Sequence, residues 1–137
     1  MRLVLDTNIL LSGLMSSAGP PALLYATWQR GAFTLISCEA QLEELRDVSR
    51  REQIRARIQA TEVGRMVNTL CALAVMVEKL PLVDASPDPY DNYLLALAMA
   101  GKADLLVTGD KRDLLGLNRH AGTAIVTTRQ AMDRISP

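Results

Sequence analysis

The chain has 137 residues, of which 49% are hydrophobic, and its 15 basic and 15 acidic side chains give a formal net charge of zero. This length and apolar content predict a single folded domain over residues 1–137 and exclude an intrinsically disordered chain. The neutral balance excludes a strongly basic nucleic-acid-binding protein, so attraction for phosphate groups must be local or carried by metal ions.

The hydrophobic pattern predicts strands and helices in alternation. Strands are expected over residues 3–5, 33–36, 82–83, 104–108 and 124–126. A first helix follows Asn8 and ends at residues 16–19, and a second runs from Pro20 to near Gly31. Further helices are expected over residues 38–48, from 61 to before Pro81, over 90–100 and 113–117, and from 127 or 128 onwards. This order predicts an α/β fold with a parallel sheet and helices on both faces.

Cys38 and Cys71 are isolated, without the CxxC spacing of a zinc site or the number needed for a disulfide framework. We expect buried free thiols. The N-terminal apolar segment is interrupted by Asp6 and Asn8, unlike a signal peptide, and the other apolar runs are too short to span a bilayer. We therefore expect a soluble, cytoplasmic protein with no membrane partner.

Acidic residues follow several of the expected strands. Asp6 ends the first strand and Asp110 ends the fourth, while Glu44 lies in the helix after the second strand. Asp91 opens the helix after a proline-rich loop, and Asp113 follows Asp110 by three residues. In an open α/β sheet, strand carboxyl ends and the starts of the following helices share one edge. We therefore expect the first four of these residues to meet in one cleft.

Carboxylates held close together repel one another unless a cation lies between them. Sites made of oxygen ligands alone select hard cations such as Mg²⁺ or Mn²⁺. Such ions can activate a water and neutralise a phosphodiester during its hydrolysis. The pattern therefore favours a metal-dependent phosphodiester hydrolase. A histidine-based triad has little support, because His120 is the only histidine.

Each acid also has a purely structural interpretation. A carboxylate can cap a helix, offset a helix dipole or lie in a turn, which applies to Asp6, Asp88, Asp91, Asp110 and Asp113. For Glu43 a solvated surface position is favoured. The arginines between Arg46 and Arg57 form either a solvated helix face or a basic wall that guides an RNA backbone, and the sequence leaves both interpretations open.

Four blocks of the chain resemble, in order, the signature blocks of PIN-domain proteins. They are Val4-Leu5-Asp6-Thr7-Asn8, Leu42-Glu43-Glu44-Leu45, Asp88-Pro89-Tyr90-Asp91-Asn92 and Val107-Thr108-Gly109-Asp110-Lys111. The similarity covers essentially the whole chain. It is closest to the small bacterial and archaeal single-domain members that are toxin components of toxin–antitoxin pairs (VapC-like).

The resemblance implies a Mg²⁺- or Mn²⁺-dependent endoribonuclease built as a three-layer α/β/α fold on a five-stranded parallel sheet. It also implies a homodimer and inhibition by a cognate antitoxin protein. Carried over to this chain, the catalytic acids are Asp6, Glu44, Asp91 and Asp110, and the metal ligands are Asp6, Asp91, Asp110 and Asp113. Polar supports on the substrate side are Thr7, Asn8 and Thr108. Apart from the resemblance, the interpretation of the arginine run as a basic wall makes Arg46 and Arg50 candidate RNA-binding residues. Asn92 stands where many relatives have a second acid.

Two other functions are compatible with parts of the pattern. The first is a PIN-like module that binds RNA or protein without cutting, although such a module has no need for uncompensated carboxylates. The second is a phosphatase or receiver-type domain that forms an aspartyl-phosphate. Asp6-Thr7-Asn8 disfavours this second function, because it lacks an acid two residues after Asp6.

Overall fold

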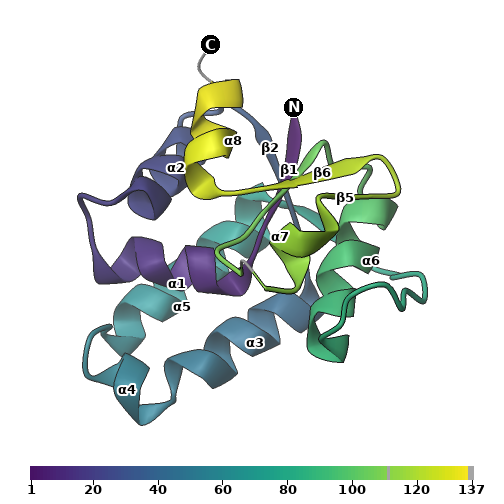
Figure 1. Cartoon of the computed structure of the whole chain (residues 1–137). Helices are drawn as coiled ribbons and strands as arrows, with labels where there is room; N and C mark the ends of the chain where they lie inside the picture. The colour runs from purple at the N-terminus through teal and green to yellow at the C-terminus, as the bar shows by residue number, and fades with distance from the viewer. Residues whose placement is uncertain (111, 136–137) are drawn as a thin grey trace.

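A mostly parallel sheet lies at the centre of the molecule, with strands in the order β3-β2-β1-β4-β6-β5 (Figure 1). The computed structural model describes residues 1–110 and 112–135, so Lys111 of the fourth signature block lies outside the described residues. The five parallel strands are β1 (Arg2–Leu5), β2 (Thr34–Cys38), β3 (Val75–Val77), β4 (Leu105–Val107) and β6 (Thr123–Val126).

The sixth strand corrects the expectation of a five-stranded sheet. β5 (Arg119–His120) is antiparallel to β6 and joins it through Ala121 and Gly122, both with positive φ. Two consecutive residues with positive φ form the tight turn that matches the twist of a hairpin. A two-residue strand has no hydrophobic periodicity of its own, which is why the sequence pattern does not reveal it.

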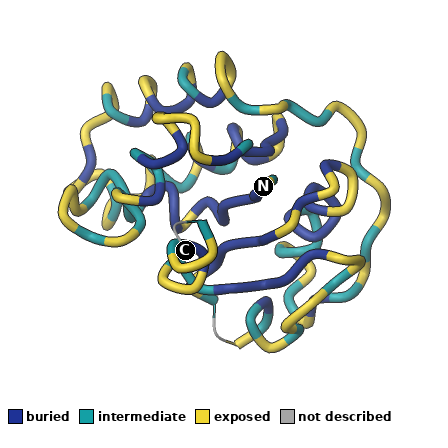
Figure 2. The backbone as a smooth tube through the Cα atoms, turned by 90° about the horizontal axis from the view of Figure 1, so that it is seen from above, coloured by how far each residue is buried: buried dark blue, intermediate teal, exposed yellow. Residues whose placement is uncertain are grey.

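Helices cover both faces of the sheet, and each face has its own hydrophobic core. One core packs the side chains of Leu3 and Leu5 against α1, α2, α3, α5 and α8; the other packs Val4 against α6 and α7. Alternating side chains of a strand point to opposite faces, so β1 contributes to both. Figure 2 shows the buried strands surrounded by partly exposed helices.

The helix bounds agree with the expected ones to within a few residues, apart from the end of α5 and from α4, which lies where no separate helix was expected. They are α1 (Thr7–Met15), α2 (Pro20–Gln29), α3 (Glu39–Ser49), α4 (Glu52–Arg55), α5 (Ala60–Leu73), the 3-10 helix η1 (Pro89–Asp91), α6 (Asn92–Ala100), α7 (Leu114–Leu117) and α8 (Thr128–Ile135). Among the described residues, no single helix is long and apolar enough to cross a membrane. The pair α1 and α2 meets that criterion only together, across a bend of 102°.

The third strand is not at residues 82–83, where it was expected. It is β3, which pairs with β2 directly after α5, while Leu82 is fully exposed. The apolar run from Leu70 to Val77 contains both the end of a helix and a strand, and hydrophobicity alone does not separate the two. The expectation for Cys71 is also wrong, because this thiol is exposed; Cys38 is buried as expected.

Gly101 ends α6 without taking the left-handed conformation in which a glycine often ends a helix. Its φ is −84°, and Lys102 takes the left-handed conformation instead, with φ of 52°. A Cβ at residue 101 would lie 2.6 Å from Cγ2 of Ile36, which is fully buried in β2. Glycine at this position therefore allows α6 to approach the sheet closely.

We expect Gly101→Ala to lower the free energy of unfolding by about 1–3 kcal/mol, because the added methyl overpacks the core around Ile36. Gly64→Ala is the matched control. Gly64 lies on the exposed side of α5, and a Cβ there meets nothing within 4 Å. It should stabilise the protein by about 0.4–1 kcal/mol through helix propensity. Urea denaturation of both variants measures these changes, and equal effects would contradict the close-approach argument.

Candidate active site

A cleft of about 490 Å³ lies at the carboxyl edge of the sheet. Residues from four separate segments line it: Asp6, Asn8, Glu44, Val48, Arg51, Asp88, Tyr90, Asp91, Leu94, Asp110 and Asp113. The acids expected to converge therefore line one cavity. Glu44 rather than Glu43 faces the cleft, because Glu43 lies on the exposed side of α3.

Asp6 is the most buried of these acids, with 7% of its surface exposed. Its Oδ2 accepts a hydrogen bond of 2.8 Å from the Thr108 hydroxyl, and its Oδ1 accepts one of 3.3 Å from the backbone N–H of Asn8. Asp6 therefore caps α1 and also lines the cleft. Burial raises the pKa of Asp6, and the hydrogen bonds from Thr108 and Asn8 oppose that rise.

Glu44 is oriented by a hydrogen-bond chain through Tyr93. The Tyr93 hydroxyl donates to Glu44 Oε1 at 2.7 Å and lies 3.1 Å from the Thr7 hydroxyl. Thr7 and Thr108 are both buried. Both threonines hold acidic residues in place, Thr7 through Tyr93 and Thr108 directly, and their burial keeps them from the cleft surface where a substrate would bind. Asn8 is exposed and does line the cleft.

A buried amide ties α3 to the central strand. Gln41 donates from Nε2 to the carbonyl oxygen of Leu5 at 2.6 Å, and its Oε1 accepts from the Ser37 hydroxyl at 2.6 Å. This places the helix that carries Glu44 against the residue that precedes Asp6. The sequence analysis did not identify Gln41 and Tyr93. A polar residue near an acid in the sequence has no distinguishing pattern, and its role is visible only from its contacts with distant segments.

Asp110, like Asp6, both holds the local backbone and lines the cleft. Its carboxylate accepts hydrogen bonds from the backbone N–H groups of Arg112, Asp113 and Leu114 at 3.1, 3.2 and 3.4 Å. Its own N–H donates to the Thr108 hydroxyl at 3.0 Å. Burial is the largest single influence and raises the pKa of Asp110, but the backbone N–H donors of Asp113, Arg112 and Leu114 together outweigh it, so the pKa is lowered.

Asp91 is the acid whose charge is least compensated. Burial, followed by the nearby charge of Asp88 and contact with the Asp110 carboxylate, raises the pKa of Asp91 from its ordinary value of 3.8 to about 7. Its Oδ2 is buried and has no hydrogen-bond partner among the described residues. A buried carboxylate oxygen without a donor is costly, unless a ligand supplies the missing interaction.

Three carboxylates, including that of Asp91, lie close together in the cleft. Among the residues that the structure describes, Asp88, Asp91 and Asp113 each place an oxygen within 4.8 Å of the other two. Of these three, Asp91 and Asp113 belong to the ligand set that the resemblance implies, and Asp88 does not. Asp88 also caps η1 by accepting from the N–H of Tyr90 at 3.0 Å. Asp6 and Asp110 line the same cleft but stand outside the tight group.

Asn92 fixes the loop that precedes η1. Its Oδ1 accepts from the backbone N–H groups of Ala85 and Ser86 at 3.1 and 2.9 Å. The amide at this position therefore holds the loop that carries Asp88 and Asp91.

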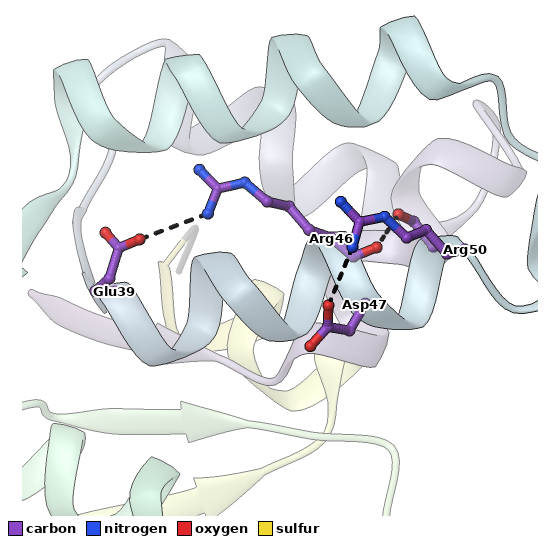
Figure 3. A network of polar contacts seen from close by, with 5 residues as sticks. Glu39, Arg46, Asp47 and Arg50 are labelled. Carbon is purple, nitrogen blue, oxygen red and sulfur yellow. Dashed lines mark hydrogen bonds and ion pairs between the residues drawn. The ribbon is translucent and has the colours of Figure 1, made fainter.

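The arginines divide between two cavities on either side of α3. Arg46 and Arg50 line a separate cavity of about 340 Å³ toward α5, and only Arg51 lines the acidic cleft. Figure 3 shows Arg46 reaching Glu39 and Arg50 reaching Asp47, with N–O distances of 3.5 and 3.4 Å. The basic-wall interpretation of the sequence placed Arg46 and Arg50 beside the acids. In the structure they line the other cavity, and Arg51 lines the acidic cleft instead.

Comparisons with known proteins agree with this architecture. Residues 2–112 match the family model described as "PIN domain". The crystal structure of PAE2754 from Pyrobaculum aerophilum is similar in fold, with a TM-score of 0.62, 16% sequence identity, and coverage of 99% of this chain and 90% of that chain. No curated protein sequence matches this chain significantly.

The raised pKa of Asp91 predicts a pH-dependent stability in the presence of a chelator. A folded-state pKa above the ordinary value means that the folded protein holds this proton more tightly than the unfolded chain. The contribution of this Asp91 proton to the free energy of unfolding is fully present below about pH 4 and is lost as the pH rises through about 7. We expect the difference in Tm between the unmutated protein and Asp91→Asn to fall between pH 4 and pH 8. Parallel Tm curves would contradict the assignment.

Proposed function

Because this chain belongs to the PIN-domain family, whose members are commonly nucleases, we propose that it is a divalent-metal-dependent endoribonuclease that hydrolyses RNA phosphodiester bonds. The observation that carries the proposal is the buried, unpartnered Oδ2 of Asp91 beside the carboxylates of Asp88 and Asp113. The cleft that they line is at the carboxyl edge of the sheet, where open α/β sheets bind their ligands, which supports the proposal.

The donor set fits a hard divalent cation. Every candidate ligand is a carboxylate oxygen, and the closest group supplies one oxygen from each of three residues. Oxygen ligands of this kind select Mg²⁺ or Mn²⁺ over softer metals. Asp91, Asp88 and Asp113 would hold the cation, and Asp6 and Asp110 contribute further negative charge to the same cleft.

The residues of the chain prepare the cleft for hydrolysis. When bound, the divalent cation supplies the Lewis acidity that lowers the pKa of a water and offsets phosphodiester charge. Tyr93 holds Glu44 by one oxygen, which leaves the second free to accept a proton from a water in the cleft. Thr108 and the N–H of Asn8 keep the Asp6 carboxylate in one orientation.

A second cavity supports cleavage within a strand rather than from its end. It has a volume of about 240 Å³ and shares Asp6, Asn8 and Asp110 with the larger cleft. These acids therefore lie between two open spaces, and a strand can continue past them on both sides. Such an arrangement suits an endonuclease.

The four signature blocks extend the proposal to a biological role. We propose that the protein is the toxin of a toxin–antitoxin pair, that it acts in the cytoplasm as a homodimer and that an antitoxin protein inhibits it. Expression of the chain alone should then arrest growth, and co-expression with the product of a neighbouring small antitoxin gene should restore it. Growth unaffected by expression would refute the toxin role.

We expect the unmutated protein to cleave RNA with Mn²⁺ or Mg²⁺ and to lose this activity in a chelator. Asp6→Asn should reduce cleavage by about 100-fold or more, because it removes a charge from the cleft at nearly unchanged volume. RNA binding by this variant should persist. If the unmutated protein binds RNA but cuts none with either metal, the chain is a non-catalytic binding module.

Glu44 and Glu43 provide a matched pair on one helix. Glu44→Gln should abolish most cleavage, because an amide cannot accept the proton from water, while its oxygen can still accept from Tyr93. Glu43→Gln, on the exposed side of α3, should cleave at the unmutated rate. The assay compares initial rates of RNA cleavage under the same metal concentration. Similar losses in both variants would argue against a specific role for Glu44.

A further inference from the structure

We propose that the cavity of about 340 Å³ between α3 and α5, called here the arginine cavity, is a second RNA-binding site. It holds the phosphate backbone of the substrate on the other side of α3 from the acidic cleft. The inference rests on the proposed ribonuclease function and adds a second contact surface for its substrate. It follows from the juxtaposition of three arginines, an apolar floor and an open space at a helix glycine.

The charged side chains of the arginine cavity are all of one sign. Arg46, Arg50 and Arg55 line it, and none of its described lining residues is acidic. Contacts between such positive side chains and phosphates supply much of the affinity of proteins for nucleic acids. The arginine cavity therefore offers RNA the positive charge that the acidic cleft supplies only through Arg51.

The ion pairs of two of these arginines leave them available to a phosphate. Arg46 lies 3.5 Å from Glu39 and Arg50 lies 3.4 Å from Asp47, and the side chains of this second pair are each 73% exposed. Ion pairs so exposed contribute little to stability, because water screens their charges. Arg55 is exposed and forms no ion pair within the described part of the chain. A phosphate can therefore bind these guanidinium groups without breaking a strong interaction.

The floor of the arginine cavity has an open space at a glycine. Ile58, Val63 and Val67 are buried apolar residues of this floor, whereas Gly64 is an exposed residue inside α5. A Cβ at residue 64 would meet nothing within 4 Å, so no packing within the described chain requires glycine there. Glycine inside a helix is less favourable than alanine. The open space instead suits a nucleotide, whose phosphate binds the arginines and whose base packs on the apolar side chains.

The arginine cavity and the acidic cleft meet at the end of α3. Arg50 lines the arginine cavity, and the next residue, Arg51, lines the cleft. Their backbone N–H groups donate to the carbonyls of Asp47 and Val48 at 3.2 and 3.1 Å, so the helix holds both residues in place. An RNA strand cut in the cleft can therefore pass from Arg51 to Arg50 and into the arginine cavity. This continuity favours RNA over an acidic protein as the ligand, because one strand engages both surfaces.

The test measures RNA binding separately from cleavage. In the Asp6→Asn background with Mn²⁺, Arg50→Gln and Arg55→Gln should each raise the Kd of a fluorescently labelled RNA about 10-fold, because each removes a charged phosphate contact. Each should also lower the slope of log Kd against log salt concentration by about 1. Both effects should be equal for RNAs of unrelated sequence, since phosphates carry no sequence information. Arg119→Gln, at an exposed position of β5 that lines neither cavity, should change neither quantity.

Two further variants test the open space and the competing acid. Gly64→Leu places a side chain in the arginine cavity and leaves its charges intact. It should raise the Kd about 5-fold or more, the effect of losing one base contact, while the salt slope stays the same. Asp47→Asn removes the acid that competes for Arg50 and should lower the Kd by about 2- to 5-fold. Urea denaturation of each variant verifies that it is folded.

Unchanged RNA affinity and salt slope in both arginine variants would overturn the second site, and an unchanged Kd in Gly64→Leu would overturn the arginine cavity as its location. If the arginine variants instead abolish binding of a labelled glutamate-rich helical peptide and leave RNA binding intact, the arginine cavity binds a protein and the proposal is wrong. The proposed function fails separately. If the unmutated protein cuts no RNA but its RNA affinity depends on Arg50 and Arg55, the nuclease proposal falls and the second site stands.

Discussion

The carboxylates at one edge of the sheet repel one another, and hydrogen-bond donors around the cleft offset this repulsion. Asp6 receives donors from Thr108 and the backbone of Asn8, and Asp110 receives three backbone N–H groups. Glu44 receives the Tyr93 hydroxyl. Asp91 alone keeps a buried oxygen without a partner among the described residues, and its pKa rises to about 7. Asp91 is therefore the acid of the cleft whose charge the surrounding groups compensate least.

Structural and functional interpretations of the same acid are not exclusive. Asp6 caps α1, Asp88 caps η1 and Asp110 binds the backbone of the following turn, while all three line the cleft. A cap uses hydrogen bonds in the plane of one carboxylate and leaves other lone pairs free. The caps also hold these side chains in fixed orientations, so a ligand that binds them need not order them first.

Helix α3 separates two chemically different surfaces. Glu44 and Arg51 line the acidic cleft, while Arg46 and Arg50 pair with Glu39 and Asp47 and line a cavity toward α5. The run of arginines that the sequence presents as one feature is therefore divided by the helical period and by the bend before α4. Among the described arginines, Arg51 alone lines the cleft together with the carboxylates.

The sequence alone determined the α/β class, four of the five parallel strands and the meeting of Asp6 and Asp110, because strand periodicity and parallel topology place strand ends at one edge. Only the tertiary structure decided which acids form the tight group, that β3 follows α5 directly and that Gly101 makes room for Ile36. The same holds for the bonds from Tyr93 to Glu44 and from Thr108 to Asp6, which join residues 49 and 102 positions apart. Such contacts depend on packing between distant segments, and no local pattern encodes them.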